Sequence, residues 1–129
     1  MTQTTIEANK RLVLDEFDEL FNKRDYNAAL RFWSPNYIQH SVHIPPGWEA
    51  LFKLIRSVPA ALRYEAGLIL VNDGFGIVHC RLSGTGQPRS WIAADIVRIA
   101  DGCLVEHWDV LLDEATSEES QSGAADVRH

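Results

Sequence analysis

The sequence predicts one α+β domain, in which helices pack on one face of a mainly antiparallel sheet. Apolar residues recur at helical intervals up to Pro59 and at alternate positions after it. Turn sequences at residues 72–74 (Asn-Asp-Gly) and 84–86 (Gly-Thr-Gly) separate the alternating segments. Helices followed by such a meander of strands are typical of the α+β class.

Three helices are predicted, at about residues 5–23, 26–33 and 47–57. Asp25 is a typical N-cap for the second helix, and Pro35 marks the end of that helix. The segment between the second and third helices is expected to be a loop. The first helix has an apolar stripe at helical spacing, formed by Ile6, Val13, Phe17, Leu20 and Phe21.

Four strands are predicted after Pro59. They are Leu68–Val71, Gly76–Ser83, Trp91–Ile99 and Cys103–Leu112. We therefore expect one domain over residues 1–112. Residues 113–129 contain almost nothing apolar from Thr116 onward and are expected to form a disordered acidic tail.

The charge of the chain bears on its partners. The net charge is −6, and the segment from Asp113 onward has five acidic residues and one arginine, so four of those charges lie in the tail. The nearly neutral body argues against a nucleic acid or an anionic membrane as partner. No signal peptide or membrane-spanning stretch is evident, so we expect a cytoplasmic protein. Cys80 and Cys103 fit no disulfide framework or zinc motif and are expected to be reduced.

The last predicted hairpin, Trp91–Asp109, carries three titratable groups. A two-residue turn would direct Asp95 away from His107 and Asp109, whereas a three-residue loop at residues 100–102 would put all three on one face. We predict the three-residue loop, with Asp95 opposite His107 and Asp109 opposite Ala93. The shared face would then comprise Asp95, Val97, Ile99, Cys103, Val105, His107 and Asp109, and the opposite face Ala94, Ile96, Arg98, Leu104, Glu106 and Trp108. A structural hydrogen-bonded group and a functional site both remain open for the three.

A family resemblance rests on these residues together. The order of helix, short helix, Tyr37-Ile38-Gln39-His40, Gly47 before a helix, meander and Glu106-His107-Trp108-Asp109 after an Asp-Gly turn resembles the SnoaL-like branch of the nuclear transport factor two-like superfamily. The resemblance covers about residues 6–112. It implies a cone, in which a strongly curved sheet wraps around helices and leaves a deep pocket open at one end.

The resemblance also implies functions and partners. Members of the superfamily are often homodimers that pack sheet against sheet, and Ile96, Leu104 and Trp108 would suit that interface here. The family includes cofactor-independent polyketide cyclases that perform an aldol step, together with isomerases, dehydratases and epoxide hydrolases. Its acid–base aspartate falls on Asp109, and an accompanying polar strand residue falls on Asp95. The sequence departs from the family loop at Ser41-Val42, where Asn-Pro is usual.

The chemistry of these residue types agrees with such a site. A carboxylate in an apolar pocket close to a second carboxylate has a raised affinity for protons, as a general base requires. His107 would complete the catalytic group, and polar donors would stabilise an enolate. The expected substrate-binding residues are Tyr37, Gln39, His40, His43, Trp33, Trp48, Phe52 and Trp91.

Three classes of function follow. The first is a cofactor-independent enzyme acting on a small hydrophobic carbonyl compound, and the second is a binding domain with the same pocket and no turnover. The third is a metal site formed by His40, His43, His107 and a carboxylate. We expect no metal, because His-x-x-His in a loop lacks the helical spacing that aims both rings at one ion.

Overall fold

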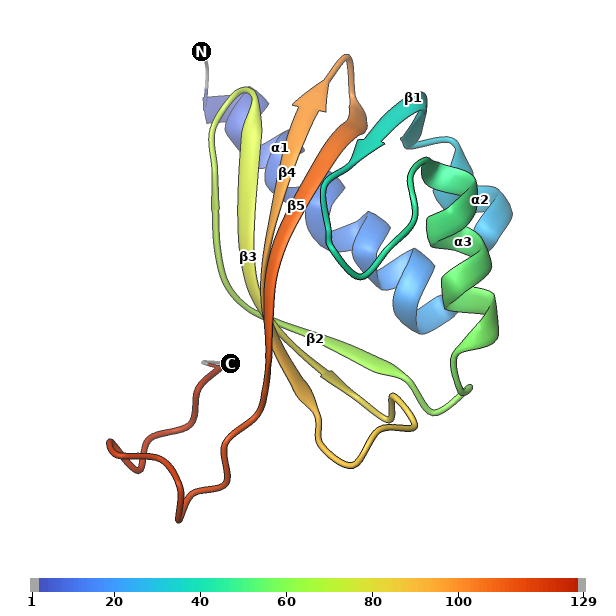
Figure 1. Cartoon of the computed structure of the whole chain (residues 1–129). Coiled ribbons are helices and arrows are strands. Elements are labelled where there is room, and N and C mark those ends of the chain that lie inside the picture. The colour runs from blue at the N-terminus through green and yellow to red at the C-terminus, as the bar shows by residue number, and fades with distance from the viewer. Residues whose placement is uncertain (1–2, 128–129) are drawn as a thin grey trace.

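Helices from the N-terminal half cover the concave face of a curved five-stranded sheet in the computed structural model (Figure 1). The structure describes residues 3–127, so residues 1–2 of the predicted domain and 128–129 of the predicted tail lie outside the described residues. The predicted α+β class is confirmed. Within residues 3–127, no helix has the length and apolar character needed to cross a membrane.

The helices are α1 (Gln3–Phe17), η1 (Asp18–Lys23), α2 (Tyr26–Leu30) and α3 (Trp48–Ser57). The predicted first helix thus continues to Lys23, with its last part as a π-helix that ends where Arg24 adopts a left-handed conformation. The Arg24 guanidinium donates hydrogen bonds to the carbonyls of Val58, at 3.2 Å, and Pro59, and so joins the end of η1 to the end of α3. Asp25 caps α2 by accepting a hydrogen bond from the Ala28 N–H.

The strands are β1 (Trp33–Gln39), β2 (Arg63–Val71), β3 (Phe75–Ser83), β4 (Trp91–Ala100) and β5 (Cys103–Asp113), in the spatial order β1-β5-β4-β3-β2. Neighbouring strands are antiparallel except for β1, which runs parallel to β5. The four predicted strands are present, and β2 begins five residues earlier than expected.

Strand β1 was not predicted. The sequence suggested a helix to residue 33 and then a loop, but α2 ends at Leu30 and Trp33 starts a strand. The carbonyl of Phe32 accepts a hydrogen bond from Leu104 N, and Gln39 is paired with His107 on β5. Pairing with β5, more than 60 residues away in the sequence, therefore makes this segment a strand. Pro35 lies within this strand, which is at the edge of the sheet, where proline is tolerated.

The predicted three-residue hairpin loop is wrong. Ala100 pairs with Cys103 across a two-residue turn whose residues Asp101 and Gly102 both have positive φ, as a type I′ turn requires. The register then shifts, because Val105 is an extra residue between the pairs Ile99–Leu104 and Arg98–Glu106. Beyond this bulge Asp95 lies directly opposite Asp109, and Val97 opposite His107.

The bulge changes which residues of β5 face the helices. Asp95, His107 and Asp109 share the inner face, as predicted, but Leu104 does too, and its side chain is completely buried in the core. The prediction that Leu104 lies on the outer face is therefore wrong, and Cys103 is only partly buried. The core consists mainly of apolar residues from α1, α3 and the inner sheet face, including Val13, Phe17, Phe52, Val78 and Val97.

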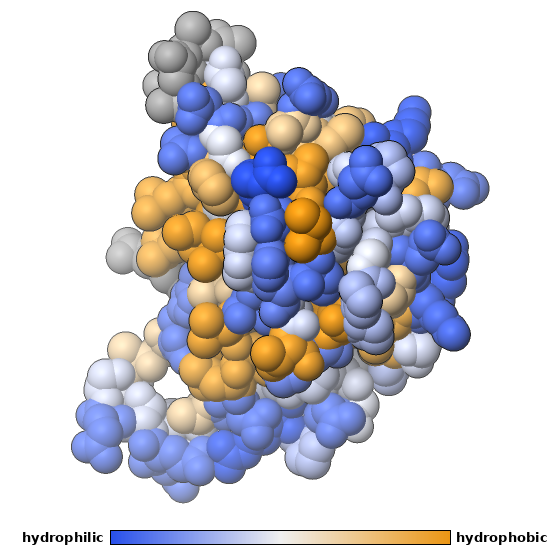
Figure 2. Space-filling view, turned by 45° about the horizontal axis from the view of Figure 1, so that its top comes forward, coloured by the Kyte–Doolittle hydropathy of each residue, from blue (hydrophilic) through white to orange (hydrophobic). Residues whose placement is uncertain are grey.

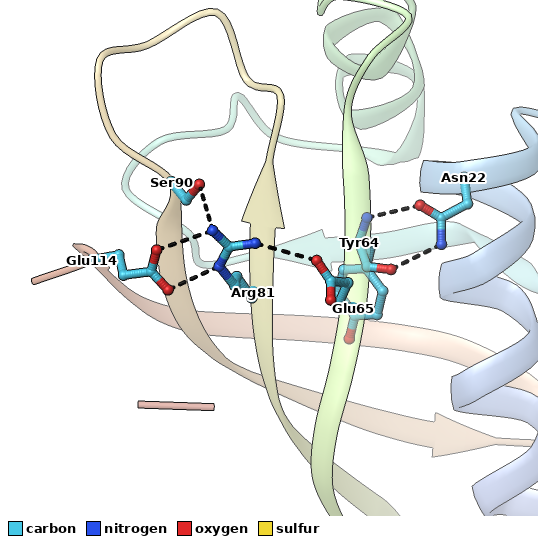
Figure 3. A network of polar contacts seen from close by, with 6 residues as sticks. All are labelled: Asn22, Tyr64, Glu65, Arg81, Ser90 and Glu114. Atoms are coloured by element: carbon cyan, nitrogen blue, oxygen red, sulfur yellow. Dashed lines mark hydrogen bonds and ion pairs between the residues drawn. The ribbon is translucent and has the colours of Figure 1, made fainter. Parts of the chain in front are cut away.

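Polar contacts link η1 to β2, and β3 to β2 and to the residues that flank β4 and β5 (Figure 3). The side-chain amide of Asn22 on η1 accepts from Tyr64 N at 2.7 Å and donates to Tyr64 O at 2.9 Å, so it pairs with the backbone of β2. Arg81 on β3 binds both carboxylate oxygens of Glu114 and also contacts Glu65. This arginine holds the pKa of the Glu114 carboxyl below its usual value.

The segment after β5 folds back beside the sheet (Figure 1). Arg89 forms an ion pair with Glu119, His79 lies 3.5 Å from Asp126, and Val127 is buried. The sequence predicted disorder here and predicted none of these contacts. The two ends of the segment Glu114–Val127 therefore contact β3, Glu114 through Arg81 and Asp126 through His79.

Candidate functional site

A cavity of about 510 Å³ lies between the helices and the concave face of the sheet. Its wall is mainly apolar and comes from α1, η1, β1, α3, β3, β4 and β5. The apolar lining includes Phe17, Phe21, Trp33, Leu51, Leu54, Ile55, Val58, Leu62, Leu82, Trp91 and Leu111. Its polar lining consists of Tyr37, His43, Asp95, His107, Asp109 and Asp113. A large apolar cavity with a few converging polar groups is typical of small-molecule sites.

Three titratable side chains meet on one wall of the cavity. Asp95 and Asp109 are directly opposite each other on β4 and β5, and His107 lies next to them on β5. One oxygen or nitrogen from each of the three lies within 4.8 Å of the others. Asp95 and His107 are 8% and 7% exposed, whereas Asp109 is partly exposed toward the cavity. The sequence prediction that these three share a face is confirmed.

Both nitrogens of the His107 ring are within hydrogen-bonding distance of an oxygen. Nε2 is 2.8 Å from Oδ1 of Asp95, and Nδ1 is 2.6 Å from Oε1 of Gln39. Gln39 also donates from Nε2 to the Tyr37 hydroxyl at 3.2 Å. A continuous chain of hydrogen bonds therefore runs from β4 through β5 to β1, and it fixes the orientation of the imidazole.

Cys80 on β3 extends this chain. Its thiol donates to Oδ2 of Asp95 at 3.3 Å, and the side chain is completely buried. Burial, reinforced by the negative charge of Asp95, raises the pKa of the Cys80 thiol well above its usual range. Cys80 therefore remains a thiol and a hydrogen-bond donor at neutral pH. The sequence analysis gave this residue no role, although its position in the alternating pattern of β3 puts it on the inner face.

Tyr37 lines the cavity and keeps its phenolic hydrogen at neutral pH, so it can donate a hydrogen bond. Burial, and to a lesser extent the charges of Asp95 and Asp109, raises the pKa of the Tyr37 phenol. Its oxygen accepts the hydrogen bond from Gln39, which leaves the phenolic hydrogen to donate to a ligand in the cavity.

Some predicted site residues lie elsewhere. His40 is on the outer face of the sheet, where Nε2 contacts Glu106 at 2.6 Å and the ring stacks on Trp108 with centroids 4.7 Å apart. It does not line the cavity, because alternation along β1 directs Tyr37 inward and His40 outward. Gln39 does not line the cavity, and its side chain instead contacts Nδ1 of His107. Trp48 and Phe52 pack beneath the lining, and Phe52 is only 1% exposed.

His43, Trp33 and Trp91 do line the cavity. Lining residues that the sequence analysis missed include Phe21 on η1 and Leu54 on α3. Phe21 belongs to the apolar stripe of the first helix, and this stripe alone could not distinguish a cavity wall from a filled core.

The metal hypothesis does not fit the described geometry. His40 and His43 lie on different sides of the sheet, so the three histidines of that hypothesis do not converge. In the remaining cluster of Asp95, His107 and Asp109, both imidazole nitrogens already contact oxygens. His107 would have to lose its contact with Asp95 or Gln39 before it could bind an ion.

The helices, the curved sheet and the cavity together define an α+β cone domain in which Asp95, His107 and Asp109 converge on the cavity wall. The SnoaL-like domain family matches residues 14–107, and the chain belongs to this family. No match is found among curated proteins.

Solved structures show the same fold. AclR, a proposed hydroxylase from Streptomyces galilaeus, is 24% identical, with a TM-score of 0.67 over 83% of this chain and 90% of its own. A proposed ketosteroid isomerase from Kribbella flavida is 12% identical, with a TM-score of 0.77 over 96% of both chains. A proposed polyketide cyclase from Bacillus cereus is 19% identical, with a TM-score of 0.68 over 86% of this chain and 78% of its own. At these identities the likeness establishes the fold.

Proposed function

We propose that this protein is a cofactor-independent acid–base enzyme that acts on a small hydrophobic carbonyl compound. The observation that carries the proposal is the position of Asp109, a carboxylate at the wall of a mainly apolar cavity, directly opposite the buried Asp95 and beside His107. Aldol-type cyclisation, isomerisation and dehydration all begin with the loss of a proton next to a carbonyl group, so one base serves all three.

In the proposed reaction, Asp109 accepts a proton from the carbon next to the carbonyl group of the substrate. The electron pair of the broken C–H bond forms the enolate, whose oxygen accepts a hydrogen bond from the Tyr37 hydroxyl. The proton returns to another carbon in an isomerase. In a cyclase the enolate carbon attacks a second carbonyl group of the same molecule, and the resulting alkoxide takes the proton from Asp109. In a dehydratase the enolate expels the β-hydroxyl group, which takes the proton from Asp109 and leaves as water. The apolar wall binds the remainder of the substrate.

Proton exchange in heavy water tests this proposal without knowledge of the natural substrate. A panel of aryl ketones and aryl 1,3-diketones is incubated with the protein in D₂O, and deuterium incorporation next to the carbonyl is followed by NMR. We expect catalysed exchange in the wild type and a loss by a factor of roughly 10² or more in Asp109→Asn. Asp101→Asn, an equal charge change in the exposed turn of the same hairpin, is the matched control. Equal exchange in Asp109→Asn and the wild type would exclude Asp109 as the base.

A binding domain without turnover is the second candidate, because the apolar cavity alone is sufficient to hold a ligand. This alternative predicts that panel compounds bind with measurable heat and that no variant changes their exchange rate. The reduced cysteines Cys80 and Cys103 agree with a cytoplasmic location, which is part of the proposal.

The proposal includes a homodimer formed through the outer face of the sheet. Large apolar side chains are exposed there, among them Leu70 (76%) on β2, Ile77 (45%) on β3 and Val110 (66%) on β5. Apolar residues form patches between hydrophilic ones on the side of the molecule seen in Figure 2. Ile96 and Trp108 remain in the proposed interface and Leu104 does not, because it is in the core. The segment Glu114–Val127 contacts His79 and Arg81 on the outer face of β3. The partner subunit would therefore contact the part of the outer face that this segment leaves exposed.

A further inference from the structure

The hydrogen bonds around His107 determine where its protons lie. Oε1 of Gln39 is 2.6 Å from Nδ1, and Oδ1 of Asp95 is 2.8 Å from Nε2. A neutral imidazole has one N–H and one bare nitrogen, and a bare nitrogen cannot make a hydrogen bond to an oxygen that carries no hydrogen.

The orientation of the Gln39 amide is fixed by a neighbour that can only donate. The backbone N–H of Ser41 points at Oε1 of Gln39, at 3.1 Å, so the atom at this position must be the oxygen. The other end of the amide, Nε2, donates to Tyr37, which agrees with this orientation. Nδ1 of His107 therefore faces an acceptor and must carry a hydrogen.

Each oxygen of the Asp95 carboxylate, on the other side of the ring, also has a hydrogen-bond partner. Oδ2 of Asp95 accepts from the Cys80 thiol, which leaves Oδ1 to accept from His107. Asp109 lies directly opposite Asp95, and two carboxylates at such short range favour a cation beside them. The contact between Nε2 and Oδ1 therefore also contains a hydrogen, and with that hydrogen on Nε2 the ring is an imidazolium.

We propose that Gln39 is a positioning residue that holds His107 as an imidazolium, so that Asp95 is neutralised and Asp109 remains the ionised base. The inference rests on the proposed function only where it assigns Asp109 as the base; the state of the ring follows from its hydrogen bonds. Without the cation, the facing carboxylates of Asp95 and Asp109 would share a proton, and a protonated Asp109 cannot act as a base. The role of His107 in this scheme is electrostatic, since both of its N–H groups are bound by protein oxygens.

The surroundings of the ring supply no second cation at hydrogen-bonding distance among the described residues. The titratable groups near His107 come from every neighbouring strand and from the loop before α3. They are Asp95, Asp109, Tyr37, Cys80 and, behind Cys80, Tyr64, together with His43 and Asp113, which line the same cavity. Tyr37, Cys80 and Tyr64 are all held neutral, because burial raises the pKa of each.

Long-range ¹H–¹⁵N NMR spectra of the histidine side chains test the inference directly on the full chain. His107 is assigned by the loss of its signals in His107→Gln. At pH 7 we expect hydrogen on both ring nitrogens in the wild type, and on only one in Gln39→Met, which has similar size and no amide oxygen. Gln39→Glu keeps an acceptor for both Ser41 N and Nδ1, so it should retain both hydrogens. A bare ring nitrogen in the wild type, or two protonated nitrogens in Gln39→Met, overturns the proposal.

The pH dependence of proton exchange distinguishes this inference from the proposed function. In Gln39→Met the acidic limb of the exchange rate should move to higher pH, because Asp95 is no longer neutralised and shares a proton with Asp109. Gln39→Glu should restore the wild-type limb, which a merely structural role of Gln39 would not predict. If no compound exchanges, the proposed function fails while the NMR result still decides the state of His107. If Gln39→Met does not fold, the wild-type spectrum alone decides.

Discussion

Glu16 on α1 is a buried acid that the proposed mechanism does not use. Its side chain is 3% exposed, and its Oε1 has no hydrogen-bond partner among the described residues. Burial, followed by the negative charges of Glu19 and Asp15, raises the pKa of Glu16 from 4.5 to about 7. We predict that Glu16→Gln, which keeps the shape and removes the charge, stabilises the protein at alkaline pH.

The magnitude follows from the pKa shift. At about 1.4 kcal/mol per pKa unit, the full shift would correspond to about 3 kcal/mol. That pKa already includes the opposing charges of Arg31 and Lys23, and solvent near the helix surface screens the charge further, so we expect about 1–2 kcal/mol. Below pH 4.5 the carboxyl group is protonated in both the folded and the unfolded chain, and the advantage of glutamine over glutamate disappears. Between pH 4.5 and 7 the unfolded chain loses its proton first, so the wild type becomes less stable as pH rises, and above pH 7 the difference is constant.

Urea unfolding at pH 4 and pH 8 measures this difference. Glu118→Gln, the same chemical change at an exposed position in the C-terminal segment, is the control and should change the free energy of unfolding by less than about 0.5 kcal/mol. A Glu16→Gln variant that is no more stable than the wild type at pH 8, or equally stabilised at both pH values, would refute the reasoning.

Three further predictions concern the hairpin. Asp109→Asn should bind a panel ketone by calorimetry yet lose most proton exchange, with a melting temperature unchanged or slightly higher, because a partly buried charge has gone; weaker binding in parallel with slower exchange would indicate a binding role instead. Trp108→Glu should give monomers or insoluble protein by light scattering, and an unaltered dimer would move the interface elsewhere. Deleting Val105 removes the extra residue while the pairs Ile99–Leu104 and Arg98–Glu106 can both be kept, so His107 and Asp109 should stay on the inner face and proton exchange should persist. A deletion variant that folds but has lost exchange would show that the local geometry of the bulge, and not only the register, positions the site.

Periodicity predicted most of the fold. The helical stripe of the first helix and the alternation in β3, β4 and β5 are local patterns, and each corresponds to one buried face. Strand β1 has no such pattern, because as a short edge strand with Pro35 in it, it is held mainly by its long-range pairing to β5. Missing β1 also misplaced His40. Once Tyr37 and Gln39 are known to face inward along a strand, alternation alone sends His40 to the outer face.

The convergence of Asp95, His107 and Asp109 on one face was predicted correctly from a wrong register, and the bulge at Val105 explains why. The three-residue loop was chosen because it kept Asp95, His107 and Asp109 on one face, whereas a simple two-residue turn would separate them. The protein satisfies the same requirement differently, with a two-residue turn near Asp101 and one extra residue farther along β5. Relative to the predicted register, the two-residue turn shifts the pairing of β5 by one residue, and the bulge at Val105 shifts it by one more. A shift of one residue reverses the face of a side chain and a shift of two restores it. Residues beyond Val105 therefore keep the predicted face, while those before it change face. This is why Leu104 lies in the core, and why Asp95 lies opposite Asp109 rather than opposite His107. The requirement that charged groups converge could be read from residue types, but the position of the compensating residue depends on which β5 side chain best fills the core.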